Sequence, residues 1–194
     1  MNSQQIKEIL LSEIHEVSIN YEKYCNDPKH DFSRKRKLPF ELMLKNIIGM
    51  GSKSITNELI DIFQASSEMP SASAFVQQRT KIKPEALKAV FDGFMSRILA
   101  SADKMRILAV DGSDIQIETN PKDKTSHIST SIDKKSFNLL HLNALYDLEE
   151  HVYTDAIIQA AKSQNEHGAL NEMVDRSEIP KALVIADRGY ESYN

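Results

Sequence analysis

The sequence contains little cysteine, no long apolar run and no leader-like amino terminus. Cys25 is the single cysteine among 194 residues, so no intrachain disulfide can form, and a reducing, cytoplasmic setting is the expectation. No apolar run approaches the roughly 20 residues that a membrane-spanning helix needs. The start of the chain lacks a basic stretch followed by an apolar one, so no signal peptide is predicted. We therefore expect no membrane partner.

Several catalytic motifs are also missing. The sequence has no Gly-x4-Gly-Lys-Ser/Thr loop, which excludes a P-loop nucleotide enzyme. The six histidines show no paired spacing typical of metal ligands, and Cys25 has no evident base to activate it, so a thiol nucleophile is not predicted. The apolar and charged fractions, 41% and 27%, are ordinary for folded domains. The length suits one large domain or two small ones.

Charge is distributed unevenly along the chain. Residues 1–105 carry 15 Lys and Arg against 13 Asp and Glu, a net charge of +2, whereas residues 106–194 carry 9 against 15, a net charge of −6. An acidic half would repel nucleic acid unless metal ions and a basic partner surface compensate for it.

The first half of the sequence has helical periodicity. Apolar residues at helical spacing predict helices over residues 3–24, 39–48, 55–63 and 72–80 and a longer one after Pro84. We expect Ser52 or Ser54 to cap the third helix and Ser71 to cap the fourth. Two short helices around Gly49-Met-Gly51 resemble a helix-turn-helix, but many all-α domains contain that arrangement.

One short stretch of this half is strongly basic. Arg34, Lys35, Arg36 and Lys37 follow one another in a polar link, residues 29–37. Such a cluster is either a solvated loop or a contact to DNA phosphates, and the second interpretation needs a surrounding positive face. Both interpretations stay open, and the four residues are candidate DNA-binding residues.

From about residue 105 the periodicity changes from helix to strand. It predicts strands over residues 106–117, 137–146, 152–158 and 181–186, a polar loop over 119–135 and a helix over 165–176 capped by Asn165. The second and third strands should form an antiparallel hairpin. The order β-β-β-α-β makes the first and fourth strands neighbours at the sheet centre. The expected fold class is therefore α+β, with an all-α domain over residues 1–104 and an α/β domain over residues 105–194.

Two aspartates interrupt strand patterns in this second half. Asp111 follows the apolar run Ile107–Val110, and Asp187 follows Ala182–Ala186. A carboxylate is costly to bury unless something positive neutralises it. If the two strands are neighbours, the aspartates lie side by side, and hard cations such as Mg²⁺ bind through one or two carboxylates. The pattern predicts a site for Mg²⁺ (or Mn²⁺); the alternative is that each aspartate merely caps a strand end.

The order of these motifs resembles the DDE transposases of bacterial insertion sequences, specifically the insertion-sequence family four group. The resemblance rests on Asp111-Gly-Ser-Asp, the strand meander, Asn165-Glu166-His167 and Ile185-Ala-Asp187-Arg-Gly-Tyr, and it extends to Ser71–Ile82. It implies a partial ribonuclease-H-like catalytic domain, preceded by a helical domain for DNA binding or dimerisation. The implied activity is cut-and-paste transposition, with double-stranded DNA at the element ends as the substrate and a homodimer as a possible assembly.

The resemblance also implies roles for single residues. Asp111 and Asp187 match the first two catalytic carboxylates, which together with a later glutamate hold two divalent ions. Arg188 is a candidate contact to the DNA backbone, with an ion pair to Asp187 as the alternative. The third carboxylate belongs to a downstream Tyr-x2-Arg-x3-Glu-x6-Lys signature, whereas this sequence ends at Asn194, and Glu191 is too close to Asp187 to replace it.

From this departure we expect an N-terminal portion, truncated before the catalytic Glu and inactive in strand transfer alone. One alternative is a non-catalytic, DNA-binding remnant that inhibits an intact transposase. Another is a different phosphoryl-transfer enzyme, although Asp111-Gly-Ser-Asp114 is not the Asp-x-Asp of aspartyl-phosphate phosphatases.

Overall fold

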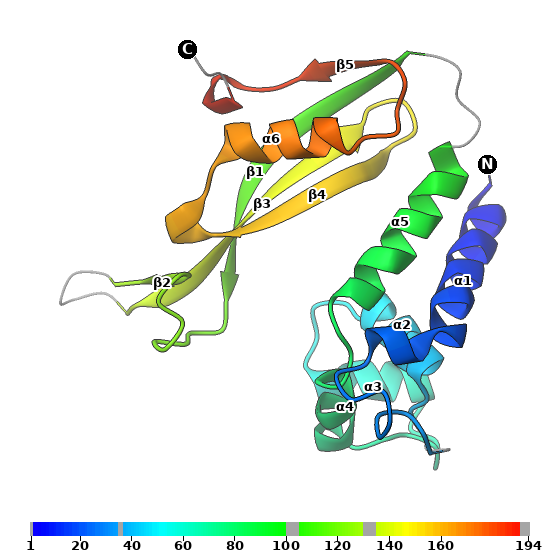
Figure 1. Ribbon diagram of the computed structural model, residues 1–194. Helices are drawn as coiled ribbons and strands as arrows, with labels where there is room; N and C mark the ends of the chain where they lie inside the picture. The colour runs from blue at the N-terminus through cyan, green and yellow to red at the C-terminus, as the bar shows by residue number, and fades with distance from the viewer. Residues whose placement is uncertain (1, 35–36, 100–104, 130–134, 191–194) are drawn as a thin grey trace. The chain divides into compact units, whose positions relative to one another are not determined.

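The computed structural model describes residues 2–34, 37–99, 105–129 and 135–190, and it has the α+β class that the sequence predicts. The chain divides into two compact units, Met1–Ser101 and Ala102–Asn194. Figure 1 shows that the first unit is helical and that the second holds the sheet. No helix among the described residues combines the length and the apolar character needed to cross a membrane.

The described residues of the first unit form five α-helices, with a capping side chain or a proline at the beginning of each. They are α1 (Ser3–Ile19), α2 (Phe40–Gly49), α3 (Ile55–Phe63), α4 (Ala72–Arg79) and α5 (Glu85–Leu99). The side chain of Ser54 accepts a hydrogen bond at the start of α3, and that of Ser71 does so at the start of α4. The prediction for Ser71 is confirmed. Of Ser52 and Ser54, the two predicted candidates for the cap of α3, Ser54 is the cap. Each such cap satisfies a backbone N–H that has no partner inside its helix.

The first helix ends earlier than its apolar pattern predicts. It stops at Ile19, and a short 3₁₀ turn, η1 (Tyr21–Tyr24), follows. Cys25 then forms an antiparallel bridge with Ile82, and the Lys83 N–H donates to the Tyr24 carbonyl at 2.8 Å. Because this pairing needs extended backbone at Cys25, the α-helix does not continue to residue 24.

Two apolar clusters hold the helical unit together, and α2 contributes to both. Leu44 packs in the first cluster and the adjacent Met43 in the second, and both are fully buried. The first cluster joins residues of α1, α2 and α5, and the second joins residues of α2, α3 and α4. Each large side chain buried in this way stabilises the fold by about 1.5–3 kcal/mol relative to exposure.

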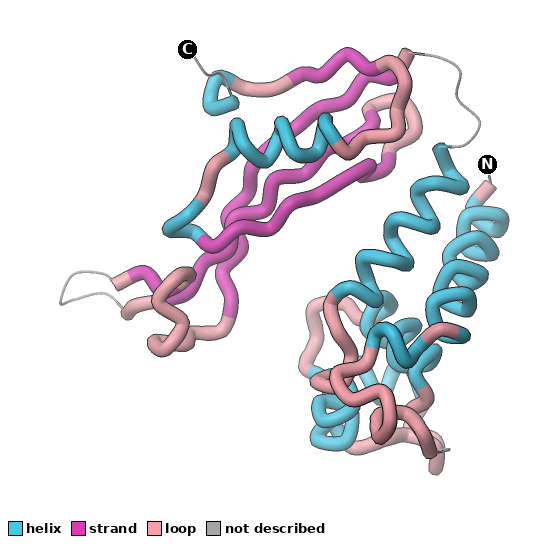
Figure 2. Tube along the Cα trace, viewed as in Figure 1, coloured by secondary structure: helices cyan, strands magenta, loops and turns pink. Residues whose placement is uncertain are grey.

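The second unit is built on a mixed five-stranded sheet (Figure 2). Its strands are β1 (Arg106–Ile117), β2 (His127–Ile128), β3 (Phe137–Asp147), β4 (Val152–Ala160) and β5 (Ala182–Ile185). β3 pairs antiparallel with β1, β2 and β4, and β5 pairs parallel with β1. The predicted antiparallel hairpin is therefore confirmed as β3 and β4.

Two sequence predictions about this sheet are wrong. The polar loop contains the short strand β2, which exists because His127 and Ile128 pair with the start of β3. The last strand is indeed a neighbour of the first, but in the described sheet it lies at an edge and not at the centre. As a consequence Leu183 and Ile185 are 51% and 49% exposed, and β5 is not a buried strand.

One helix, α6 (Glu166–Asp175), packs against a face of the sheet (Figure 1). The Asn165 side chain caps it, as predicted, by accepting from the Gly168 N–H at 2.9 Å. Met173 of α6 packs with Leu108, Val110 and Leu145 of the sheet. This docking fixes the first turn of α6 near the middle of β1.

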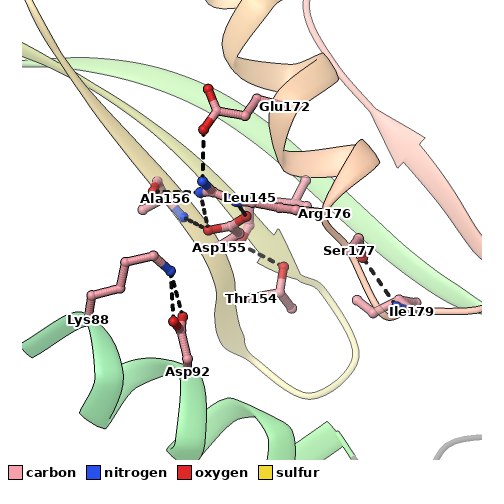
Figure 3. A network of polar contacts seen from close by, with 10 residues as sticks. All are labelled: Lys88, Asp92, Leu145, Thr154, Asp155, Ala156, Glu172, Arg176, Ser177 and Ile179. Atoms are coloured by element: carbon pink, nitrogen blue, oxygen red, sulfur yellow. Dashed lines mark hydrogen bonds and ion pairs between the residues drawn. The ribbon is translucent and has the colours of Figure 1, made fainter. Parts of the chain in front are cut away.

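The far end of α6 is held by Arg176 (Figure 3). Its guanidinium donates to both carboxylate oxygens of Asp155 on β4, each at 2.7 Å, and to Glu172 at 2.9 Å. Two parallel N–H···O bonds fix an arginine more firmly than a single contact does. The helix is therefore tied to the sheet by polar contacts at its carboxyl end and by apolar packing along its length.

The beginning of β1 and the end of β3 carry a buried ion pair. Nη1 of Arg106 donates to Oδ2 of Asp147 at 2.6 Å, and the two side chains are 2% and 0% exposed. Oδ1 of Asp147 accepts from the backbone N–H groups of Glu149 and Glu150, which form the turn into β4. The pair therefore fixes both the β1–β3 register and the hairpin turn.

Candidate active site

Of the two predicted catalytic aspartates, Asp111 belongs to a strand and Asp187 follows the end of the neighbouring strand. Asp111 lies within β1, opposite Ala144 of β3. The parallel register pairs Ala109 of β1 with Ile185 of β5, and continuing it by two residues brings Asp111 level with Asp187. Both aspartates are exposed. The structure thus places both carboxylates at the same end of the β1–β5 pair.

Each aspartate is oriented by the backbone that follows it. The Gly112 N–H donates to Oδ1 of Asp111 at 2.9 Å, and the Gly189 N–H donates to Oδ1 of Asp187 at 2.8 Å. The second contact belongs to the 3₁₀ turn η3 (Arg188–Tyr190). No residue in the described part of the chain donates to Oδ2 of either aspartate. One oxygen of each side chain is therefore held, and the other is available to a ligand.

Two further titratable side chains stand beside this pair, and sequence reasoning missed both. His141 on β3 is the cross-strand partner of Asp114, and its Nδ1 lies 2.9 Å from Oδ1 of Asp114. Its Nε2 lies 3.1 Å from Oε1 of Glu166, in the first turn of α6. The arrangement depends on strand register and on helix docking, which the spacing of histidines in the sequence does not show.

Two glycines make room for Glu166. A Cβ atom at Gly112 would lie 2.7 Å from Nε2 of His141 and 2.8 Å from Oε1 of Glu166. A Cβ atom at Gly189 would lie 2.6 Å from Oε2 of Glu166 and 3.1 Å from Oδ1 of Asp187. The Glu166 carboxylate therefore reaches both aspartate-bearing segments, and it does so through space that any other residue type would fill.

The pKa of Tyr190 is affected by the negative charge of this region. Its hydroxyl is buried and donates to Oδ1 of Asn143 at 2.9 Å. Burial, followed by the charges of Glu166, Asp111 and Asp187, raises the pKa of Tyr190 to about 12. Three carboxylates thus act on one hydroxyl group.

The two aspartates suit a hard divalent cation that keeps several water ligands better than a metal ion coordinated entirely by protein side chains. No group of three or more His, Cys, Asp or Glu side chains in the described ranges is arranged to hold a metal ion. Mg²⁺, however, is usually bound through one or two carboxylates while it keeps several waters. The exposed oxygens of Asp111 and Asp187 meet that lower requirement.

The predicted DNA-binding residues have different surroundings. Arg34 is exposed and lines a cavity of about 180 Å³ in the helical unit together with Ser33 and Lys81. Lys37 is exposed, and its ammonium group donates to the backbone carbonyl of Ser67. Lys35 and Arg36 lie outside the described residues.

Arg188 is exposed at the start of η3. It forms no ion pair with any residue that the structure describes, so the alternative role that we considered, pairing with Asp187, is not found there. Its guanidinium remains a candidate contact for a phosphate.

The single cysteine belongs to the helical unit. Cys25 is fully buried in the helical unit. Burial, followed by the charge of Asp31, raises the pKa of its thiol to about 11. The reactive thiolate is therefore scarce at neutral pH.

The fold and the geometry together define a class of site. One exposed carboxylate lies on β1, a second follows the end of the parallel neighbour β5, and a helix brings a third carboxylate beside them. This arrangement suits cation-dependent phosphoryl transfer. Residues 102–194 match the family model described as a transposase DDE domain, which supports a DDE transposase. No curated protein and no solved structure matches the chain. The narrower assignment to the insertion-sequence family four group stays a prediction.

Proposed function

We propose that this protein is a cut-and-paste transposase of the insertion-sequence family four group that acts on double-stranded DNA in the cytoplasm. One observation carries the proposal: Asp111 of β1 and Asp187, two residues after the end of the parallel neighbour β5, are both exposed at the same end of the β1–β5 pairing, within the segment that matches the transposase DDE domain. A ribonuclease-H-like arrangement of residues 105–194 is part of the proposal, and the mixed sheet with its parallel β1–β5 pair is compatible with it.

In this proposal Asp111 and Asp187 hold Mg²⁺ or Mn²⁺ with the carboxylate oxygens that no described residue engages. When bound, two such ions would supply activation of the attacking hydroxyl and charge stabilisation at the leaving oxygen. The backbone N–H groups of Gly112 and Gly189 keep the two carboxylates in orientation. Arg188, next to Asp187, contacts the phosphate backbone of the DNA.

The helical unit, residues 1–104, is proposed to bind DNA or to form a homodimer. Arg34 supports the first role because it lines a cavity with Lys81 and Ser33, where a phosphate oxygen would meet cationic and hydroxyl groups. Lys35, Arg36 and Lys37 would extend this basic surface. Because Lys37 already donates to Ser67, we expect Arg34 to contribute more to binding than Lys37.

The cation site is tested by iron-directed cleavage of the polypeptide. Fe²⁺ replaces Mg²⁺ in the 194-residue chain, and ascorbate with peroxide then generates radicals that cut nearby backbone. We expect cuts close to residues 111 and 187 that excess Mg²⁺ suppresses and that the variants D111N and D187N lose. D92N is the matched control, because Asp92 is an exposed carboxylate paired with Lys88 in the helical unit. Cuts that persist in both active-site variants would contradict the proposal.

The alternative function, DNA binding without catalysis, is separated by two measurements. The 194 residues carry two carboxylates of the implied triad, so we expect no efficient nicking of supercoiled DNA by this chain alone with Mn²⁺. DNA binding is followed by fluorescence anisotropy at several salt concentrations. R34A should weaken binding and reduce the salt slope by about 1 for each phosphate that the variant no longer neutralises, whereas K88A should leave both unchanged. Efficient nicking would contradict the requirement for a third carboxylate. If R34A binds DNA as the unmodified chain does, Arg34 does not contact phosphate and the basic stretch is a solvated loop.

A further inference from the structure

Among the described residues of the sheet unit, Nε2 of His141 is a buried side-chain atom that has no hydrogen-bond partner. The residue is 5% exposed, and Nε2 makes no hydrogen bond, although Oε1 of Glu166 lies 3.1 Å away. A buried polar atom without a hydrogen bond is costly, and a bound ion or a catalytic role is among the explanations for such an atom in a native structure. This nitrogen faces the Glu166 carboxylate from the side opposite to Asp114, which holds Nδ1.

The carboxylate of Glu166 has close neighbours on several sides. His141 borders Oε1, and Gly112 and Gly189 leave space for Oε1 and Oε2, respectively. The side chain is 27% exposed, so the carboxylate is reachable by solvent ions. Both glycines follow within two residues of a proposed catalytic aspartate, so Glu166 touches the segments that orient Asp111 and Asp187.

The local charge is unbalanced in a way that a cation would relieve. Glu166, Asp111 and Asp187 all act on Tyr190 and raise its pKa. Like charges held close together in a partly desolvated region repel, and a divalent cation converts that repulsion into attraction. The three carboxylates do not form a ready metal cage within the described residues. Glu166 would therefore act by its position and charge, not as a direct ligand.

We propose that Glu166, which lies against His141, is a positioning residue that raises the affinity of the Asp111–Asp187 pair for a divalent cation. This inference rests on the proposed function, since it needs the two aspartates to bind the cation. It adds a residue from the first turn of α6 to the site, upstream of Asp187 and distinct from the downstream glutamate that the transposase resemblance implies.

The test measures Mn²⁺ binding to the 194-residue chain. The electron paramagnetic resonance signal of free Mn²⁺ falls as the ion binds, so a titration with MnCl₂ gives the dissociation constant without any catalysis. E166Q keeps the shape of the side chain and removes its charge, and we expect about a tenfold loss of affinity, in the range found for residues that support metal ligands. E172Q is the matched control, because Glu172 lies on the same helix, 62% exposed and paired with Arg176.

Two more variants separate position from charge. H141N keeps a donor toward Asp114 but removes Nε2, and we expect a smaller loss of affinity than for E166Q. E166D keeps the charge on a shorter side chain that no longer reaches the two glycines, so it should also weaken binding. Thermal unfolding by circular dichroism is recorded for every variant, and a variant counts only if it folds; E166D and H141N supply the comparison if E166Q does not.

The outcomes are distinguishable. Loss of affinity in the Glu166 and His141 variants, with E172Q unchanged and D111N and D187N unable to bind, supports the inference. If D111N and D187N abolish binding while the folded Glu166 variants match the unmodified chain, the inference is overturned and the proposed function stands. If D111N and D187N bind Mn²⁺ as the unmodified chain does, the proposed function fails and the inference fails with it.

Discussion

Two positions along the pairing between β1 and β3, its beginning and its interior, differ in how their carboxylates are surrounded. At the beginning of β1, Asp147 is fully buried, and its charge is met by Arg106 and two backbone N–H groups. Five residues further along the strand, Asp111 is exposed, and within the described chain only the Gly112 N–H meets its carboxylate. The neutralised acid stabilises the fold, and in our proposal the acid without a positive partner binds the cation.

The largest expected effect comes from breaking the buried pair. R106M removes the guanidinium and leaves the Asp147 carboxylate buried without its cationic partner. Loss of one partner of a buried ion pair destabilises a protein by about 3–5 kcal/mol. Urea unfolding followed by circular dichroism in the sheet unit measures this change. The double variant R106M/D147L should recover much of the loss, since two apolar side chains leave no buried charge; equal instability of the single and double variants would contradict this account.

A smaller loss of stability is expected when low pH protonates Asp147. Burial alone would raise the pKa of Asp147, but the Glu150 N–H, the Arg106 guanidinium and the Glu149 N–H together hold the pKa below its usual value of 3.8. The folded state therefore binds this proton less readily than the unfolded state, and the stabilisation is complete above pH 3.8 and is lost as the pH falls through the lowered pKa. Melting temperatures of the unmodified chain and D147N should differ most near neutral pH and converge in strong acid. A gap that stays constant down to pH 2 would argue against this role.

The smallest effect is expected at the exposed end of the comparison. D111N removes a charge that no described cation neutralises, so the free energy of unfolding should change by less than about 0.5 kcal/mol, as for most surface substitutions. Slight stabilisation is the expected direction, because the substitution reduces repulsion from Asp187 and Glu166. Urea unfolding of D111N and D187N without divalent ions provides the measurement. A loss comparable to that of R106M would mean that Asp111 is a structural residue.

Sequence patterns predicted helices and strands correctly where apolar periodicity or a nearby capping side chain was enough to determine them. The strand over residues 106–117 and the Asn165 and Ser71 caps follow from periodicity and from hydrogen-bonding side chains close in sequence. The strand β2 has only two residues and exists through its pairing with Asn138 and Phe137, which no local window contains. The apolar β5 was predicted to lie at the sheet centre, yet it lies at an edge and is exposed, because its position depends on which strands flank it.

The residues of the candidate site also fall into those that the sequence predicted and those that it did not. Asp111 and Asp187 were predicted because each interrupts an apolar run, which is visible in the sequence. Glu166 and His141 could not be predicted, because one reaches the site through the docking of α6 and the other through the β1–β3 register. Gly112 and Gly189 were present in the motifs, but the reason for a missing Cβ is the Glu166 carboxylate, which comes from a distant part of the chain.

The burial of Cys25 has a consequence for how the helical unit can be observed. Since it is the only thiol in the 194 residues and is fully covered, a thiol-specific reagent can reach it only in molecules that have opened transiently. The backbone bridge to Ile82 must separate in such openings if residues 24–26 are to leave residues 81–83. The labelling rate under native conditions therefore counts the open population, and the unaltered chain carries its own probe of breathing motions in that unit.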